Sequence, residues 1–160
     1  MLNLHPLECT IKDNDHIPDL LLIKYWGIIS CKYWRCKLTG NLIIPTGVTT
    51  IEMCAFAECN KLTGNLIIPE GVISVGELAF SNTYYVDGGS LTIPASIKII
   101  GNSAFPSDLS PVYCKAVTPP DIDSGSFSNY SKLYVPLNCA EIYRNASGWN
   151  KFESIEEVEF

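Results

Sequence analysis

Apolar and polar residues alternate in short blocks that return at a nearly constant distance along the chain. The block LTGNLIIP at residues 38–45 recurs at residues 62–69, and a shortened copy, SLTIP, stands at residues 90–94. Each block alternates like a half-buried strand, and its proline ends the strand because it cannot donate to a strand ladder. The pattern predicts three equivalent strands that are 24 or 25 residues apart.

Apolar positions behind each proline repeat with the same step. These positions are Val48, Val72 and Ile97; Ile51, Val75 and Ile100; and the Ala-Phe pairs at residues 55–56, 79–80 and 104–105. One unit of this length cannot bury its own apolar face, whereas stacked units share a continuous core. We therefore predict a solenoid whose strands point Leu42/Ile44, Leu66/Ile68 and Leu91/Ile93 inward.

Weaker copies of the unit extend the array on both sides. Upstream, CKYWRC at residues 31–36 matches CAFAEC at residues 54–59, which places Tyr33 in the phenylalanine position and Ile28 in the isoleucine position. We expect about five coils over residues 25–136, and residues 1–24, which match no copy, to form an irregular N-terminal segment.

The downstream copy is shorter than the others. VTPP at residues 117–120, followed by Ile122 and Phe127, reads as one unit with three residues missing between its last two anchors. LYVP at residues 133–136 then supplies the closing strand.

Residues 137–160 carry the pattern of a C-terminal cap. Asn138 followed by Glu141 predicts a capping box that opens a short helix, ended by Gly148. The buried residues expected here are Ile142, Tyr143 and Ala146 on the helix, and Trp149, Phe152 and Ile155 behind it. The alternation of EVEF at residues 157–160 predicts a strand with one wet face.

The whole unit, L-x-x-L-x-I-P-x-G/S-V-x-x-I-x-x-x-A-F, resembles the BspA-like leucine-rich repeat of bacterial cell-surface proteins. The ending from residue 133 to residue 155 is similar to the terminal unit of such proteins. The resemblance implies a right-handed leucine-rich-repeat coil, mostly β with short turns and 3-10 segments, that is secreted or at the cell surface and binds proteins or glycans. One departure is Glu52, which replaces the glycine that Gly76 and Gly101 retain after the isoleucine anchor.

Charge and hydropathy exclude several classes of partner. The net charge is −6 and the eleven basic residues are scattered, so no stripe exists to neutralise the phosphates of a nucleic acid. The longest apolar stretch, residues 17–29, is too short and too charged to cross a bilayer. Residues 1–7 do not read as a secretory signal, which favours a missing native start over a cytoplasmic protein.

Candidate chemistry is sparse. The two histidines, His5 and His16, lie in the N-terminal segment, and no positioned pair of titratable groups or phosphate-binding loop is recognisable. We expect no enzymatic activity and no cofactor.

Seven cysteines leave an odd number, so a disulfide framework is not implied. Two of their pairs, Cys31/Cys36 and Cys54/Cys59, are in register on neighbouring coils. Small buried free thiols are the preferred interpretation; disulfides between coils or a metal site remain alternatives.

The candidate binding residues are the outward positions of the strands. They are Ile43, Ile67, Thr92 and Tyr134, with Tyr113 or Lys115 from the intervening coil. Such a row is more apolar than a purely solvated face needs, and exposed apolar patches often mark contact sites; strand propensity alone is the competing explanation.

The leading hypothesis is a non-catalytic adhesion or recognition module. A structural spacer within a larger surface protein and an intracellular interaction scaffold are the alternatives.

Overall fold

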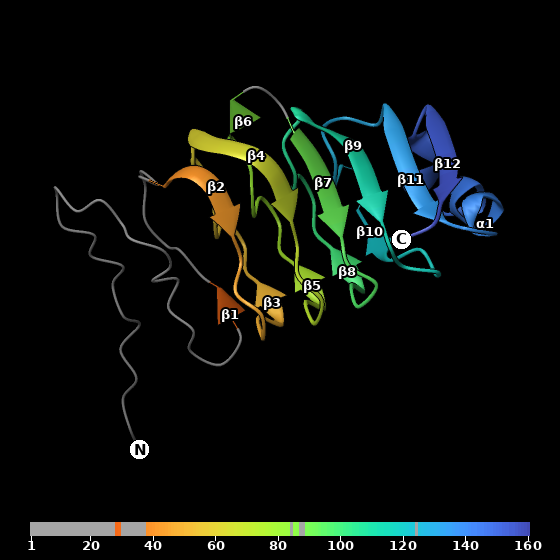
Figure 1. Cartoon of the computed structure of the whole chain (residues 1–160), viewed down its shortest axis with the longest axis horizontal. Coiled ribbons are helices and arrows are strands. Elements are labelled where there is room, and N and C mark those ends of the chain that lie inside the picture. Colours follow the sequence, from red (N-terminus) through yellow and green to blue (C-terminus); the bar gives the residue numbers. More distant parts are fainter. Residues whose placement is uncertain (1–27, 30–37, 84, 87–88, 124) are drawn as a thin grey trace, which may run out of the picture.

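The chain winds into a coil whose strands stack as two parallel sheets (Figure 1). The computed structural model describes residues 28–29, 38–83, 85–86, 89–123 and 125–160. The segment predicted over residues 1–24, and Tyr33, lie outside the described residues. The boundaries at residues 24 and 136 stay a prediction.

Seven strands form the wide sheet, in the order β12-β11-β9-β7-β4-β2, with β6 beside β4. Their bounds are β2 (Thr39–Ile43), β4 (Lys61–Ile67), β6 (Tyr85–Val86), β7 (Gly89–Ile93), β9 (Leu109–Cys114), β11 (Lys132–Pro136) and β12 (Ser154–Val158).

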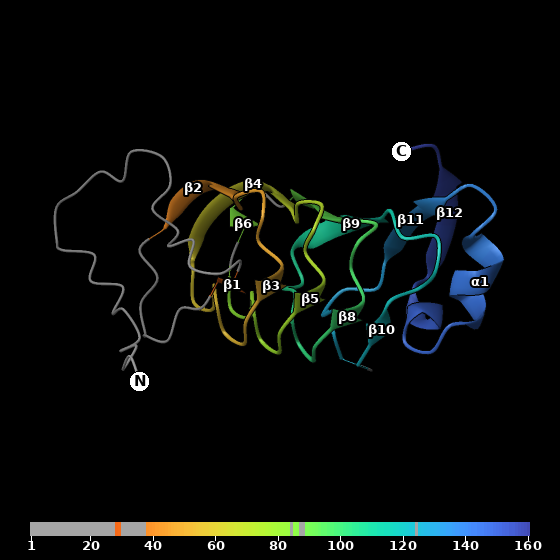
Figure 2. The ribbon, with the colours of Figure 1, turned by 90° about the horizontal axis from the view of Figure 1, so that it is seen from below.

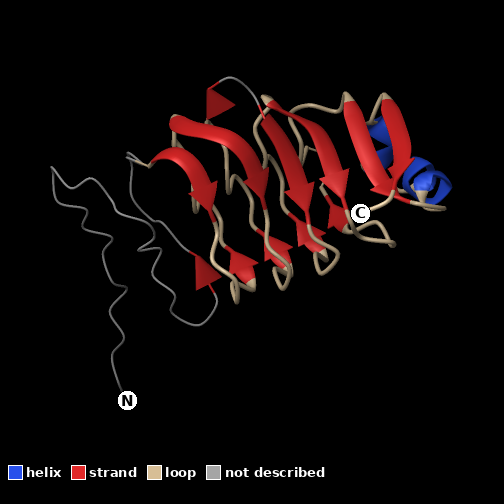
Figure 3. Ribbon diagram, viewed as in Figure 1, coloured by secondary structure: helices blue, strands red, loops and turns tan. Residues whose placement is uncertain are grey.

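Five two-residue strands form the narrow sheet on the opposite side of the coil (Figure 2). They are β1 (Ile28–Ile29), β3 (Thr50–Ile51), β5 (Ser74–Val75), β8 (Ile99–Ile100) and β10 (Asp121–Ile122). Figure 3 shows that loops and turns connect the two sheets along the coils and that the helices gather at the C-terminal end.

The core lies between the sheets and is made of the predicted anchors. All of the inward strand residues and all of the anchors behind the prolines of the three clear coils are at most 7% exposed. The phenylalanine positions stack from coil to coil, with ring centroids 5.0 Å apart for Phe56 and Phe80, 5.7 Å for Phe80 and Phe105, and 5.5 Å for Phe105 and Phe127. The solenoid prediction is confirmed, because one repeat position becomes one continuous row in space.

Close approach between coils explains the repeated glycine. A Cβ atom on Gly76 would lie 2.5 Å from the Met53 nitrogen and 2.7 Å from the Glu52 carbonyl carbon. Gly101 sits in the same way against Glu77, 2.5 Å from its nitrogen. These contacts are to backbone, which cannot move aside as a flexible side chain could.

Two details of the predicted alignment are wrong. Ile29, not Ile28, pairs with Ile51, so the first copy is one residue out of step with its predicted position. In the downstream coil, the strand is β9, whose Cys114 pairs with Ile93, and not the segment around Val117.

The shortening of the downstream coil is therefore elsewhere than predicted. Ile122 pairs with Ile100, and Phe127 bridges to Phe105. The two anchors keep their spacing of five residues, so the missing residues precede Ile122. Prolines at residues 119–120 resembled the repeat proline, but the strand ladder fixes the register instead.

The C-terminal end holds α1 (Ala140–Asn145) and the 3-10 helix η1 (Trp149–Lys151), followed by β12. The predicted capping box is absent from this helix, because its N-cap is Cys139 and no side chain of the cap accepts a hydrogen bond. The Glu157 carboxylate of β12 accepts the Ala140 N–H at 2.9 Å instead. A distant residue thus supplies what the local motif was expected to supply.

The buried side of this end is aromatic. Trp149 and Tyr143 are fully buried, and Phe152 and Ile155 are nearly so, as predicted. The Trp149 Nε1–H donates to the Pro120 carbonyl at 2.8 Å, and the Tyr143 hydroxyl donates to the Ala116 carbonyl at 2.7 Å. These bonds fasten the helices to the coil that β9 begins.

Ile142 contradicts the prediction, since its side chain is 51% exposed. The helix has six residues and rests on the coil through Ala140 and Tyr143. These two residues are three apart, so they share one face, and Ile142 projects to one side of it. The predicted strand over residues 157–160 lies earlier, at β12.

Candidate functional site

The five outward residues predicted as a binding face stand in one unbroken row across the wide sheet. Ile43 pairs with Ile67, Ile67 with Thr92, Thr92 with Tyr113, and Tyr113 with Tyr134. Paired positions on neighbouring parallel strands lie directly beside one another, about 4.8 Å apart. We call Ile43, Ile67, Thr92, Tyr113 and Tyr134 the binding face, because their pattern in the sequence predicts contact with a partner.

The two ends of the binding face differ in exposure. Ile43 is 54% exposed and Ile67 is 57% exposed, whereas the other three residues are partly buried. The Tyr113 and Tyr134 rings stack at 4.9 Å with their planes 13° apart. The face therefore passes from a bare aliphatic end to a packed aromatic end.

Charged side chains contact the aromatic end. The Lys132 ammonium lies 3.0 Å from the Glu156 carboxylate and 4.9 Å from the centroid of the Tyr134 ring. The pKa of Lys132 is raised, first by its interaction with the Tyr134 side chain and then by Glu156, so the lysine stays charged. The ion pair is solvent-exposed and therefore adds little to the stability of the fold.

The sequence left Tyr113 and Lys115 open as the residue of the intervening coil, and the structure places Tyr113 in the row. Lys115 follows two residues later on the same side, and its ammonium lies 5.8 Å from the Phe160 ring centroid. Tyr113 meets the same ring edge-on, at 6.4 Å and 83°.

Two residues of this surface were not predicted. Glu156 continues the row because it pairs with Tyr134, and Phe160 reaches back to β9. Parallel pairing of β12 with β11 decides both positions, and nothing in the repeat pattern reveals that pairing.

The cysteine interpretation is only partly right. Of the two paired cysteines that the structure describes, Cys54 is free but only half-buried, and Cys59 is disulfide-bonded, so the interpretation as a buried free thiol is wrong for Cys59. Cys114 and Cys139, which belong to neither pair, are free and buried. Cys31 and Cys36 lie outside the described residues. Burial raises the pKa of the free Cys114 thiol to about 11, despite its hydrogen bond with Tyr143, so this thiol is a poor nucleophile.

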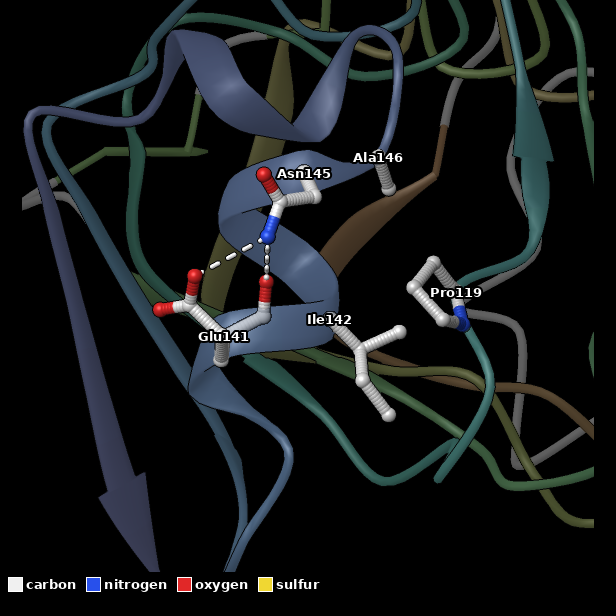
Figure 4. Close-up of a pocket in the computed structure, with 5 residues that line it drawn as sticks. All are labelled: Pro119, Glu141, Ile142, Asn145 and Ala146. Carbon is white, nitrogen blue, oxygen red and sulfur yellow. Dashed lines mark hydrogen bonds between the residues drawn. The ribbon is translucent and has the colours of Figure 1, made fainter.

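Two features bear on possible chemistry in the part of the chain that the structure describes, namely groups of metal-ligating side chains and hollows in the surface. No three His, Cys, Asp or Glu side chains gather there in a group that could hold a metal ion. An open groove of about 530 Å³ lies beside α1 (Figure 4). Pro119, Ile142 and Ala146 line it together with Glu141 and Asn145, whose side chains hydrogen-bond to each other.

Among the described helices, none has the length and apolar character needed to cross a membrane.

Comparison with known proteins identifies the family. The family model of the BspA type leucine rich repeat region matches residues 28–153 in six copies, and the chain belongs to this family. The match runs past β11 into the helices, so the family's repeats include part of the predicted cap. Neither the curated proteins nor the solved structures gave a match.

Family membership supports a general class of function. Leucine-rich repeats form interaction modules that typically bind proteins, and they are generally non-catalytic.

Proposed function

We propose that the protein is a recognition module of the adhesion type, which binds a partner protein through the binding face and acts at the cell surface or after secretion. The observation that carries the proposal is the single row in which all five outward residues stand side by side. Surface proteins of bacteria often carry repeats of this family, which supports the location.

The aliphatic end of the row supports a contact role. Ile43 and Ile67 are adjacent and both more than half exposed. Two large aliphatic side chains in contact with water form an apolar patch, and burying them under a partner is favourable by about 25 cal/mol for each Å² covered.

The aromatic end favours a protein over a glycan as the partner. Sugars bind proteins by lying on the free faces of aromatic rings. Tyr134 already has Tyr113 stacked on it and the Lys132 ammonium over its ring. Tyr134 therefore offers its ring edge and hydroxyl, and these suit the hydrogen-bonding and apolar groups of a polypeptide.

The proposal is tested with the double variant Ile43→Lys/Ile67→Lys in a binding screen against matrix proteins, mucins and glycans. We expect loss of binding to the partner that the unmodified protein selects, with the unfolding midpoint in urea unchanged. The matched control is Ile73→Lys/Ile99→Lys, because these isoleucines are 44% and 55% exposed beside or in the narrow sheet, away from the face.

Each outcome separates the hypotheses. Equal loss of binding in both variants would assign binding to general surface charge and overturn the proposal. No binding by the unmodified protein to any class in the screen would favour the spacer. Loss of folding in the first variant alone would contradict the exposure of Ile43 and Ile67 in the structure and overturn the proposed face.

A further inference from the structure

The segment that follows β12 crosses back over the aromatic end of the binding face. Val158, at the end of β12, pairs with Pro136 of the neighbouring strand β11. Only two residues later, the Phe160 ring lies against Tyr113 of β9, beyond β11. Figure 2 shows this segment rising from β12 on the outer side of the wide sheet.

Phe160 makes two contacts of kinds that favour an aromatic ring. Tyr113 presents its ring to Phe160 at 83°, which is the edge-to-face arrangement that aromatic quadrupoles favour. The Lys115 ammonium lies 5.8 Å from the centroid of the same ring, within the range of a cation–π contact. Tyr113 therefore contributes an aromatic contact, and Lys115 contributes a positive charge.

The contact is incomplete in two respects. Phe160 remains 50% exposed, so half of its surface gains nothing from being there. Within the described ranges, the Lys115 ammonium has no carboxylate at ion-pair distance, whereas Lys132 has Glu156. An incoming group could replace the ring and also satisfy the unpaired ammonium.

Without Phe160, the place keeps the Tyr113 ring and the Lys115 ammonium. Glu156 belongs to β12 and is paired to Lys132. The vacated place on β9 is therefore positive and aromatic. It complements a ring with a neighbouring carboxylate.

We infer that the place between Tyr113 and Lys115 receives an aromatic side chain flanked by a carboxylate from the partner protein, and that Phe160 fills this place until the partner displaces it. This inference rests on the proposed function, because it names the chemistry of the partner segment at the binding face. Phe160 thus acts as an internal stand-in for the partner's ring.

The probe for the test is the dipeptide N-acetyl-Glu-Phe-amide, titrated into the full 160-residue chain and followed by the backbone amide resonances of residues 113–115. Removing the stand-in with Phe160→Ala is expected to raise the affinity for the probe about threefold or more. While Phe160 competes for the site, the apparent dissociation constant of the probe equals its intrinsic dissociation constant divided by the fraction of time that the site is free. Lys115→Met in the Phe160→Ala background should reverse the gain, since it removes the ammonium and keeps an apolar stem.

Matched probes and a matched variant make the result specific. N-acetyl-Gln-Phe-amide and N-acetyl-Glu-Ala-amide each lack one half of the inferred chemistry and should bind more weakly. Val117→Ala shortens another exposed side chain, 66% exposed, and should leave the affinity unchanged. Equal affinity of Phe160→Ala and the unmodified protein, or resonance changes away from residues 113–115, would overturn the inference.

The dipeptide experiment needs no partner, so its failure and that of the proposed function are distinguishable. Suppose that Phe160→Ala does not bind the dipeptide more tightly, while Ile43→Lys/Ile67→Lys loses partner binding. The proposed recognition function would then be supported, and the inferred displacement of Phe160 by an aromatic side chain would be wrong.

Discussion

The aliphatic and the aromatic halves of the wide sheet share one backbone arrangement and differ in almost everything else. At β2 and β4, the outward positions are bare isoleucines in coils that are 24 residues apart. At β9 and β11, the outward positions are stacked tyrosines in coils that are 21 residues apart, with lysines and Phe160 around them.

The comparison shows which positions the solenoid constrains. Inward residues must fill the space between the sheets, and both halves therefore carry buried residues of suitable size: Leu42, Leu66, Val112 and Leu133. The ladder of backbone hydrogen bonds holds the register whatever the outward side chain is. Outward residues are consequently free to differ, and one fold can present two kinds of surface.

The two halves also keep their coils together by different means. The early coils approach closely at glycines, as at Gly76. The late coils end against aromatic residues and charged groups contributed by α1, η1 and β12. A mutation in the glycine contacts or in the C-terminal contacts should therefore destabilise one half of the molecule more than the other.

The largest effect is expected for Trp149→Ala. This change leaves a cavity beside Phe127 and Tyr143 and removes the bond to the Pro120 carbonyl. The free energy of unfolding should fall by about 3–5 kcal/mol, measured by urea denaturation. Hydrogen exchange should show lost protection first at β11 and β12, since each coil depends on its neighbours.

Ile67→Ala is the control, since it shortens an exposed side chain and should change the unfolding free energy by less than about 0.5 kcal/mol. A loss of protection in Trp149→Ala that begins at β2 instead would show that the two halves are not stabilised separately.

A smaller effect is expected for Gly76→Ala. The new methyl group would meet the backbone of Glu52 and Met53, and crowding of this kind costs about 1–3 kcal/mol. Asp123→Ala is the matched change in the late half, because Asp123 follows Ile122 as Gly76 follows Val75, and its side chain is exposed. Urea midpoints for the two variants should differ; equal midpoints would remove the distinction between glycine-packed and cap-packed coils.

The smallest effect is expected for Glu157→Gln, and it depends on pH. The pKa of Glu157 is lowered, first by the hydrogen bond from the Ala140 N–H. A carboxyl group whose pKa is lower in the folded protein contributes stability above its unfolded pKa, about 4.3, and loses that contribution as the pH falls through the folded value. The unmodified protein should therefore be more stable than the variant at pH 7.

The two stabilities should converge below pH 4, measured by thermal unfolding from pH 7 to pH 3. Glu153→Gln, at an exposed residue just before β12, serves as the control. A difference between Glu157→Gln and the unmodified protein that does not change with pH would show that the charge of Glu157 plays no part.

The fold and the row of the binding face could be predicted because they follow from a pattern that repeats. Ile44, Ile68 and Ile93 occupy the same buried position in three repeats. An ambiguous assignment in one repeat can therefore be resolved by comparison with the other two. The prediction weakened where the copies diverge: Ile28 was placed one residue out of register, and the strand β9 was missed in favour of the proline-rich segment after it.

Local motifs at the C-terminal end were less reliable. Asn138 and Glu141 match a capping box, and Ile142 fits an apolar helix face, yet neither behaves as its motif predicts. A helix of six residues is positioned by what it rests on, because so short a helix has little stability of its own.

By itself, the sequence determined which side of the three clearly repeated strands is buried and that Ile43, Ile67 and Thr92 share the outward side, since alternation and a constant period are properties of the chain alone. Tertiary structure decided what surrounds the row. Glu156 beside Tyr134, Phe160 on Tyr113 and Glu157 at the start of α1 depend on the parallel docking of β12 on β11. That docking joins segments with no common pattern, so only packing in three dimensions selects it.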